Sequence, residues 1–438
     1  MTGPSNGRDV AFLTAEKILQ LGSIAIVNVI LVRALGPEKF GFLGSATAIL
    51  AIAIPLASFG QVSVIRFISA GGYSSVRLTR FAGLLSTCSS VLAGLAMIAL
   101  AFSPLFQVEP THHLLLILSL AVLARPLSAA DAYFQATGQN GVAAATRVAS
   151  LIVPTILRVQ IAFGSQSLDQ LAWVLVIENV TAGLFMTVAY IARRRRGSVE
   201  LRVSRAIPHR EILAQSIPLL VAGLAVILYL RVSYPLLLLL ANSAEVSYFS
   251  AATNLVDALS FVPTMLFTAF LPKLVQSRQV ALEIFNGQME KVLRFTAGLG
   301  VIFTLGGLVF GPLVIWLLYG PEYSESGVVV QILFLGCPFI FIGVMRHVWI
   351  VTEGLQRETL VGSSLALAIN VAANFALIPT YGAVGAAVAA LLAHATNGVL
   401  SFALFKSTRS IFVESLVAML PWKWFPVVLS VVKHRRLL

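Results

Sequence analysis

The sequence predicts an all-α polytopic membrane protein with about 12 transmembrane helices in two six-helix halves. Hydrophobic residues make up 58% of the 438 residues and charged residues only 11%, whereas an average soluble chain carries about 25% charged residues. Apolar stretches of about 20 residues, enough to cross a bilayer, follow one another along the chain. Lys and Arg gather in every second connection between them. These observations exclude a soluble globular enzyme, a disordered protein and a nucleic-acid-binding domain, so no nucleic-acid partner is expected.

The apolar stretches define twelve expected spans, each bounded by polar or turn-forming residues. Their boundaries carry an uncertainty of about 2–4 residues. The expected spans are 10–32, 41–65, 81–102, 113–135, 142–163, 170–192, 212–240, 246–271, 292–318, 326–351, 359–378 and 381–405.

Short connections with helix-breaking residues separate several of these spans. Gly36-Pro37 lies between the first two, Gly320-Pro321 lies between the ninth and tenth, and Pro379 to Gly382 lie between the last two. Proline cannot continue a helix and glycine permits a left-handed turn. We therefore expect the chain to reverse at each of these points.

The positive charges predict the orientation in the membrane. The net charge is +12. Twenty-three of the 30 Lys and Arg residues fall in one set of connections and tails, and three fall in the alternate set. Because cytoplasmic loops collect Lys and Arg, this alternation predicts that both termini are cytoplasmic.

The order of spans and charges predicts four regions. Residues 1–192 form an N-terminal six-helix half and residues 212–405 a C-terminal six-helix half. Between them, residues 193–211 form a basic cytoplasmic linker that contains Arg193 to Arg196. Residues 406–438 form a basic cytoplasmic tail with an interfacial segment, in which Trp422 and Trp424 are expected at headgroup level.

No signature of an enzyme is present. The chain has no Walker A motif, no Gly-x-Ser-x-Gly and no His-Glu-x-x-His. The outer connections are too short to fold into a catalytic domain. Cys88 and Cys337 lie in apolar segments without metal-ligand spacing. We expect a membrane transporter with no catalytic residues, no cofactor and no metal, whose helix bundle does the work.

Charges inside the expected spans are the candidate site residues. A charge at the bilayer centre costs about 2.5–3.5 kcal/mol on insertion scales, so each needs a partner or a watery cavity. Arg125 and Arg231 are candidates for binding an anionic headgroup in a central cavity, because guanidinium suits phosphate. Asp257, Glu178 and Asp131 are candidates for ion coupling.

Two other interpretations of such charges remain open. They can pair between helices, or reach the interface from near a helix end. Arg346, near the cytoplasmic end of its span, favours such a structural role, as does His394 as a hydrogen-bonded core residue. Pro126 directly follows Arg125 and is the candidate gating residue, since proline removes a helix hydrogen bond where the charge sits.

Several segments together resemble one family. They are Val32 to Gly41, Phe270 to Leu274, Leu318 to Tyr323 and, most specifically, Asn370-x-x-x-Asn374 followed by Ile378-Pro379-x-Tyr381-Gly382. The chain resembles the polysaccharide-repeat flippases (Wzx-type translocases) of the multidrug/oligosaccharidyl-lipid/polysaccharide export superfamily. The resemblance covers all twelve spans and ends at about Arg409. One departure is Ser233, which stands where the family often has an acidic residue.

The resemblance implies a function and partners. Such proteins move an undecaprenyl-diphosphate-linked oligosaccharide from the inner to the outer leaflet of the bacterial cytoplasmic (inner) membrane. Two halves rock around a cationic cavity while the polyprenyl tail stays among the membrane lipids. A polysaccharide polymerase and a chain-length regulator are further partners that the resemblance suggests. Ion antiport, also suggested for the family, predicts that neutralising Asp257 abolishes translocation.

Two alternatives remain beside the flippase. One is a multidrug/cation antiporter of the same superfamily, which the near balance of buried Arg and acid leaves open. The other is a non-transporting scaffold of a polysaccharide-synthesis complex, against which the buried central charges argue.

Overall fold

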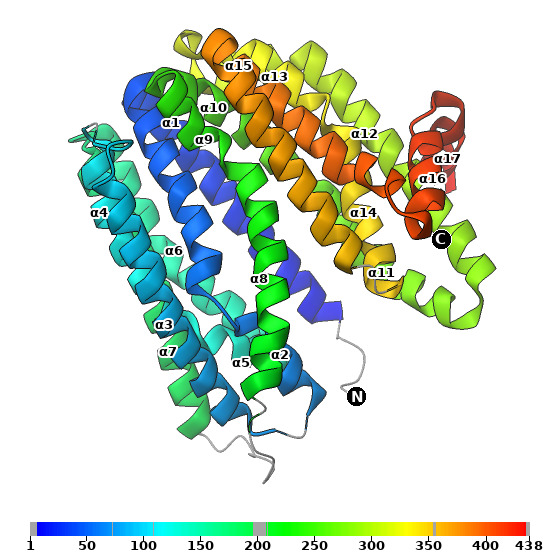
Figure 1. The fold of residues 1–438 in the computed structure, drawn as a ribbon, viewed down its shortest axis with the longest axis horizontal. Coiled ribbons are helices and arrows are strands. Elements are labelled where there is room, and N and C mark those ends of the chain that lie inside the picture. The colour runs from blue at the N-terminus through cyan, green and yellow to red at the C-terminus, as the bar shows by residue number, and fades with distance from the viewer. Residues whose placement is uncertain are drawn as a thin grey trace. The chain divides into compact units, whose positions relative to one another are not determined.

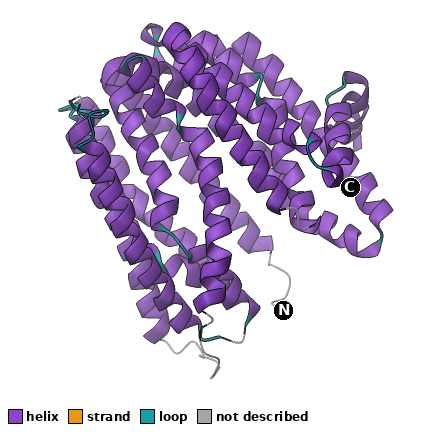
Figure 2. Cartoon of the chain, in the orientation of Figure 1, coloured by secondary structure: helices purple, strands orange, loops and turns teal. Residues whose placement is uncertain are grey.

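The computed structural model describes residues 7–71, 73–107, 109–195, 207, 209–353 and 356–434. Within these ranges the regular structure is helical, and Figure 2 shows helices joined by short loops. The chain packs as two units, residues 1–224 and 225–438. The boundary lies inside one helix, so the domain limits expected from the sequence stay predictions.

The N-terminal unit is built from helices that run alongside one another. α1 packs against α3, α4 and α6, while α6 packs against α7. Its elements are α1 (Gly7–Ala57), α2 (Gln61–Ala70), α3 (Ser75–Ala101), α4 (Thr111–Leu123), η1 (Arg125–Ser128), α5 (Ala130–Ala136), α6 (Asn140–Phe163), α7 (Leu168–Arg195) and the first part of α8 (His209–Arg231).

The C-terminal unit contains the last turns of α8 and all later helices. α12 packs against α13 and α14, and α15 packs against α9, α13 and α14. Its further elements are α9 (Ser233–Leu240), α10 (Ser243–Leu259), α11 (Phe261–Val280), α12 (Leu282–Tyr319), η2 (Pro321–Tyr323), α13 (Ser326–Phe334), α14 (Cys337–Glu353), α15 (Gln356–Gly398), η3 (Leu400–Ala403), η4 (Lys406–Thr408), α16 (Arg409–Ala418) and α17 (Pro421–His434).

Two long helices each contain a reversal at a glycine. α1 holds 51 residues and α15 holds 43, which at about 1.5 Å per residue is far longer than one span. Gly36 in α1 has φ 72° and Gly382 in α15 has φ 50°, values that favour glycine. Figure 1 shows each helix turning back at this point. α1 and α15 therefore each supply two of the expected spans.

The number of spans agrees with the prediction. Nine described helices are long and apolar enough to cross a membrane, or up to eleven if each bent pair counts as one span. This count treats α1 and α15 as one span each. The fold is therefore the expected all-α polytopic one with about 12 spans, and the protein is a multi-pass membrane protein. The orientation of its termini stays a prediction.

Several expected spans are interrupted, and these interruptions position the candidate residues. The fourth span is divided into α4, η1 and α5 around Pro126. The seventh is divided into α8 and α9 at Val232, and the eighth into α10 and α11 at Ser260. A broken helix exposes backbone groups and lets side chains turn inward. Four of the five candidate charges lie beside such breaks: Arg125, Asp131, Arg231 and Asp257.

The tail packs on the C-terminal unit. α16 and α17 meet at a bend of 76°. Trp424 of α17 lies against Gly298 of α12, where a Cβ would stand 2.8 Å from the ring atom Cε3. Trp424 is thus buried, which differs from the expectation that it faces the headgroups, while Trp422 is exposed. Glycine at position 298 provides the room that the indole needs.

Most of the basic linker lies outside the described residues. This applies to Arg196, the last residue of the arginine run, and to residues 197–206. The predicted role of residues 193–211 stays a prediction.

Candidate functional site

Two of the predicted site residues meet in the C-terminal unit. Arg231 ends α8, and its Nη2 lies 3.2 Å from Oδ2 of Asp257 on α10. Arg231 Nη1 also donates to the Tyr234 hydroxyl at 3.2 Å. The position at a helix C-terminus favours the cation, because the helix dipole is negative there. The sequence analysis predicted anion binding for Arg231 and ion coupling for Asp257, and the structure joins the two residues in one ion pair.

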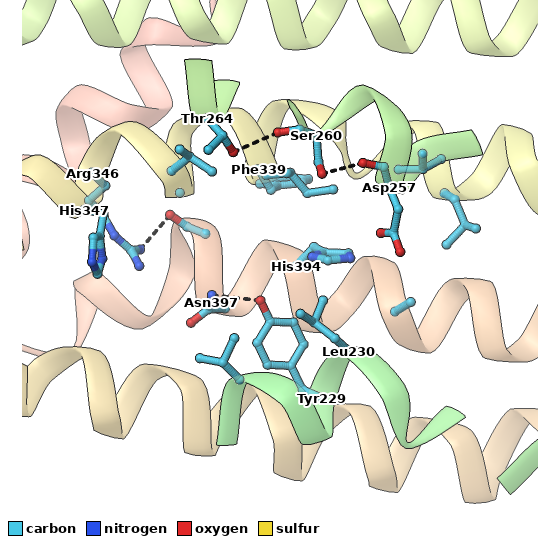
Figure 3. A pocket seen from close by; sticks show the side chains of 18 of the residues that line it. Tyr229, Leu230, Asp257, Ser260, Thr264, Phe339, Arg346, His347, His394 and Asn397 are labelled. Carbon is cyan, nitrogen blue, oxygen red and sulfur yellow. Dashed lines mark hydrogen bonds between the residues drawn. The ribbon is translucent and has the colours of Figure 1, made fainter. Parts of the chain in front are cut away.

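The break after α10 holds Asp257 in place. The Ser260 hydroxyl donates to the Asp257 carbonyl at 2.6 Å, and the Thr264 hydroxyl donates to the Ser260 carbonyl at 3.1 Å (Figure 3). The Asp257 carbonyl also accepts from the Ser260 backbone N–H at 3.2 Å, so the chain stays hydrogen-bonded across the break. The carboxylate remains 45% exposed and accessible from the space beside it.

That space is a cavity of about 480 Å³. Its walls come from α8, α10, α11, α13, α14 and α15, all within residues 225–438. Apolar side chains such as Phe249, Phe267 and Phe339 supply much of the wall, and a few polar groups converge on it. This combination is typical of a ligand site. Arg231 and Asp257 both line the cavity.

Arg346 of α14 also lines this cavity, and its side chain is 3% exposed. Its Nη1 donates to the Gly398 carbonyl at 2.7 Å, and its guanidinium carbon lies 3.5 Å from the centre of the Phe402 ring. Among the described side chains, no carboxylate lies within ion-pair distance of Arg346. Arg346 therefore joins α14 to the end of α15, which is the contact between helices that the sequence left open for it, and within the described residues it does so without an acidic partner.

Neutral polar groups from α8 and α15 line the rest of the cavity. The Asn397 amide donates to the Tyr229 hydroxyl at 3.1 Å, and the Tyr229 ring meets His394 edge-on at 5.9 Å between centroids. Figure 3 shows His394 and the Asp257 carboxylate directed toward the same space. The sequence did not single out Tyr229 or Asn397. A signal was available, since His394 and Asn397 are three residues apart on one face of a helix.

The most family-specific motif lies beside this site. Asn370 and Asn374 of α15 are fully buried. Asn374 Nδ2 donates to the Ser233 hydroxyl at 3.0 Å and to the Asn370 Oδ1 atom at 2.9 Å. These bonds attach α15 to the first turn of α9, directly after the break that carries Arg231. Ser233, the residue that departs from the family pattern, is thus part of this buried polar contact.

Arg125 belongs to the N-terminal unit. It begins η1, and its Nη2 lies 3.4 Å from the Ser58 hydroxyl, while its Nε has no hydrogen-bond partner. Ser58 lines a cavity of about 180 Å³ together with Gly60, Ser63 and Ser216. Pro126 sits in the interrupted turn. The gating role of Pro126 and the binding role of Arg125 stay predictions.

Asp131 and Glu178 also belong to the N-terminal unit, and both are paired with arginine. Arg147 of α6 lies 2.7 Å from Asp131 of α5, and Arg158 of α6 pairs with Glu178 of α7. This is the interhelical pairing that the sequence left open as the alternative to ion coupling. Neither carboxylate lines the cavity of about 480 Å³ or the one of about 180 Å³.

In the described part of the chain, His, Cys, Asp and Glu side chains form no group of three that could hold a metal ion.

The cavity lies among interrupted helices of a multi-pass membrane protein, and Arg231, Asp257 and Arg346 line it. A model of the family described as polysaccharide biosynthesis protein matches residues 7–278. Since the match covers more than half of the chain, the protein belongs to this family. A comparison with curated protein sequences found no match.

Solved structures show the same fold. The chain matches the lipid II flippase MurJ in an inward closed conformation with a TM-score of 0.66 and 14% identity, over 97% of this chain and 99% of that one. It matches an inward-facing multidrug resistance MATE family transporter of the MOP superfamily with a TM-score of 0.64 and 13% identity, over the same shares. A MOP superfamily transporter from Pyrococcus furiosus gives a TM-score of 0.58 and 13% identity, over 99% and 100%. The family match confirms the expected polysaccharide family, and these structures confirm the expected fold.

Proposed function

We propose that the protein translocates a polyprenyl-diphosphate-linked oligosaccharide repeat unit across the bacterial cytoplasmic membrane for surface polysaccharide biosynthesis. The observation that carries the proposal is the family match over residues 7–278. The fold supports it, since a lipid II flippase shares this arrangement of helices. The protein acts as a transporter and not as an enzyme.

The cavity of the C-terminal unit supports an anionic cargo. Its lining includes Arg231, Asp257 and Arg346, so two fixed positive charges face one negative charge. A diphosphate linkage is anionic, and guanidinium groups bind phosphate in a fork geometry. The apolar wall suits the sugar faces and the first isoprene units.

The mechanism we propose is alternating access with the polyprenyl tail left in the lipid. Asp257 is the coupling residue, because its carboxylate is both paired with Arg231 and accessible from the cavity. Protonation or cation binding at Asp257 releases Arg231, which changes the charge that the cargo meets. Pro126 and the interrupted fourth span provide flexibility in the N-terminal unit.

The orientation follows from the charges of the connections. We propose that both termini and the linker 193–211 face the cytoplasm. Labelling single cysteines from outside intact cells tests this. Cysteines placed near Gly36 and Gly320 are expected to react, and cysteines near Arg409 are expected to be protected.

A multidrug/cation antiporter is the second candidate, since a MATE family transporter shares the fold. A cationic cargo needs excess negative charge in its cavity. The excess of arginine in the cavity weighs against this function.

The test is a lipid analysis of a strain that lacks the gene, with and without the gene restored. We expect the deletion to remove surface polysaccharide and to trap diphosphate-linked repeat units on the cytoplasmic leaflet. Restoring the gene should reverse both effects. Intact polysaccharide with unchanged lipid intermediates, in a strain with no second flippase, would overturn the proposal and favour drug-efflux assays.

A further inference from the structure

We infer that Arg346, and not Arg231, is the residue that binds an oxyanion in the cavity of the C-terminal unit. The inference rests on the proposed function and identifies where the cargo's negative charge is held. The oxyanion is either the diphosphate that links lipid to sugar or the carboxylate of an acidic sugar, because both present oxygen atoms to a guanidinium in the same way.

Arg231 is already neutralised. Its Nη2 is 3.2 Å from the Asp257 carboxylate, and its Nη1 donates to Tyr234. An anion that binds Arg231 has to displace the Asp257 carboxylate, which is part of the protein and always lies beside it. The pair contributes almost no net charge to the cavity while it stays closed.

Arg346 carries an uncompensated charge at a buried position. It lines the same cavity, its side chain is 3% exposed, and no described carboxylate pairs with it. Its Nε has no hydrogen-bond partner. A buried, unpaired charge is costly, which argues for a ligand that compensates it.

The contacts that Arg346 does make orient it without neutralising it. The bond to the Gly398 carbonyl uses one of the five N–H donors of the guanidinium. Stacking on Phe402 fixes the plane of the group. Capping the end of α15 accounts for one donor, and no hydrogen bond to a described acceptor accounts for the others. His347, His394, Tyr229 and Asn397, which line the cavity around it, add no fixed negative charge.

The experiment is calorimetric titration of inorganic diphosphate into the purified protein in lipid nanodiscs. We expect Arg346→Gln to weaken binding about tenfold or more, since it removes a charge-assisted fork. The affinity of Arg346→Lys for diphosphate should lie between those of the wild type and Arg346→Gln, because lysine keeps the charge but lacks the paired N–H donors of a guanidinium. The charge-conserving double variant Arg231→Gln with Asp257→Asn should lose less binding than Arg346→Gln, because the pair that it replaces contributes almost no net charge. Arg147→Gln is the matched control outside the cavity and should bind like the wild type.

A second variant keeps the inference testable if Arg346→Gln does not fold. Asn397→Asp places a carboxylate next to Gly398 and can still bond to the Tyr229 hydroxyl. It is expected to weaken diphosphate binding about tenfold by like-charge repulsion. Size-exclusion elution and thermal unfolding establish that each variant is folded.

A second probe, methyl glucuronide, separates the two sources of the oxyanion. If diphosphate binds more tightly than methyl glucuronide and its binding depends on Arg346, the oxyanion is the diphosphate that links lipid to sugar. Tighter binding of the glucuronide with the same dependence assigns it to an acidic sugar. Either supports the inference.

The inference is overturned if Arg346→Gln and Asn397→Asp both bind diphosphate and glucuronide like the wild type, or if the wild type binds neither. It is also overturned if the double variant loses binding that Arg346→Gln keeps. In any of these cases a wild-type gene that restores surface polysaccharide leaves the proposed function standing. If diphosphate binding depends on Arg346 but the wild-type gene fails to restore polysaccharide, the oxyanion site is supported and the proposed function is overturned.

Discussion

The N-terminal and C-terminal units place their charged side chains differently. In the N-terminal unit, Arg147 and Arg158 of α6 pair with carboxylates on neighbouring helices. In the C-terminal unit, the Arg231–Asp257 pair lines a cavity of about 480 Å³. The same residue types thus join helices in one unit and face a ligand-sized space in the other. An ion pair is therefore expected to matter for transport when it lines a cavity, and to matter for stability when it only joins helices.

The largest effect is expected when Asp257 is neutralised. Asp257→Asn removes the coupling carboxylate and leaves Arg231 unpaired in the cavity. We expect surface polysaccharide to fall to the level of the deletion strain, while the amount of folded protein in the membrane stays near that of the wild type. Immunoblotting and polysaccharide staining measure the two. Full polysaccharide with Asp257→Asn would remove this residue from the mechanism.

The next effect tests whether the N-terminal pair is structural. Arg158→Leu leaves Glu178 charged between α6 and α7. Because the two side chains are 14% and 25% exposed, the cost should lie between the about 0–1 kcal/mol of an exposed pair and the about 3–5 kcal/mol of a buried one. Thermal unfolding in detergent should show the loss. The double variant Arg158→Leu with Glu178→Leu should recover most of the stability, because an apolar pair can replace a buried ion pair.

The double variant also makes the comparison between units direct. We expect it to support polysaccharide synthesis, in contrast to the neutralised Asp257. A stable double variant that fails to transport would show that Glu178 has a role beyond joining helices, and the distinction between the units would be wrong.

A smaller effect is expected where the two units are alike, at glycines facing interrupted helices. A Cβ at Gly183 of α7 would meet Leu127 of η1, and a Cβ at Gly307 of α12 would meet the Phe334 ring of α13. Alanine at either position should cost about 1–3 kcal/mol through overpacking. Gly306, with no atom near its Cβ position, is the matched control, and Gly306→Ala should be neutral or slightly stabilising. Equal unfolding temperatures for the three variants would contradict the packing that we describe.

The smallest effect is expected at the more exposed pair of the N-terminal unit. Arg147 is 34% exposed in its side chain and lies 2.7 Å from Asp131. Exposed pairs contribute about 0–1 kcal/mol. Arg147→Gln should therefore change the unfolding temperature little, and polysaccharide synthesis should continue. A loss as large as that of Arg158→Leu would show that partial exposure does not weaken this pair.

Much of the fold could be predicted because it depends on local properties of the chain. Apolar length defined the spans, and the reversals at Gly36 and Gly382 followed from glycine and proline chemistry. The interruption at Pro126 was expected for the same reason. The break at Val232 has the same cause, since Pro235 cannot donate to the Arg231 carbonyl four residues before it.

The site could be predicted only in part because ion pairing depends on tertiary contacts. The sequence identified Arg231 and Asp257 separately but could not show that they meet. It assigned Arg346 to a helix end, because position along a span suggests depth and does not show which way a side chain points. The structure instead buries Arg346 and provides no described carboxylate for it.

The most direct test of the central claim is a translocation assay in proteoliposomes. A polyprenyl-diphosphate-linked oligosaccharide is placed in both leaflets, and an external glycosidase measures the fraction that becomes accessible with time. We predict that the wild type and the Arg158→Leu with Glu178→Leu variant make the inner pool accessible, and that Asp257→Asn does not. Accessibility that is no faster with the wild-type protein than in protein-free liposomes would contradict the account.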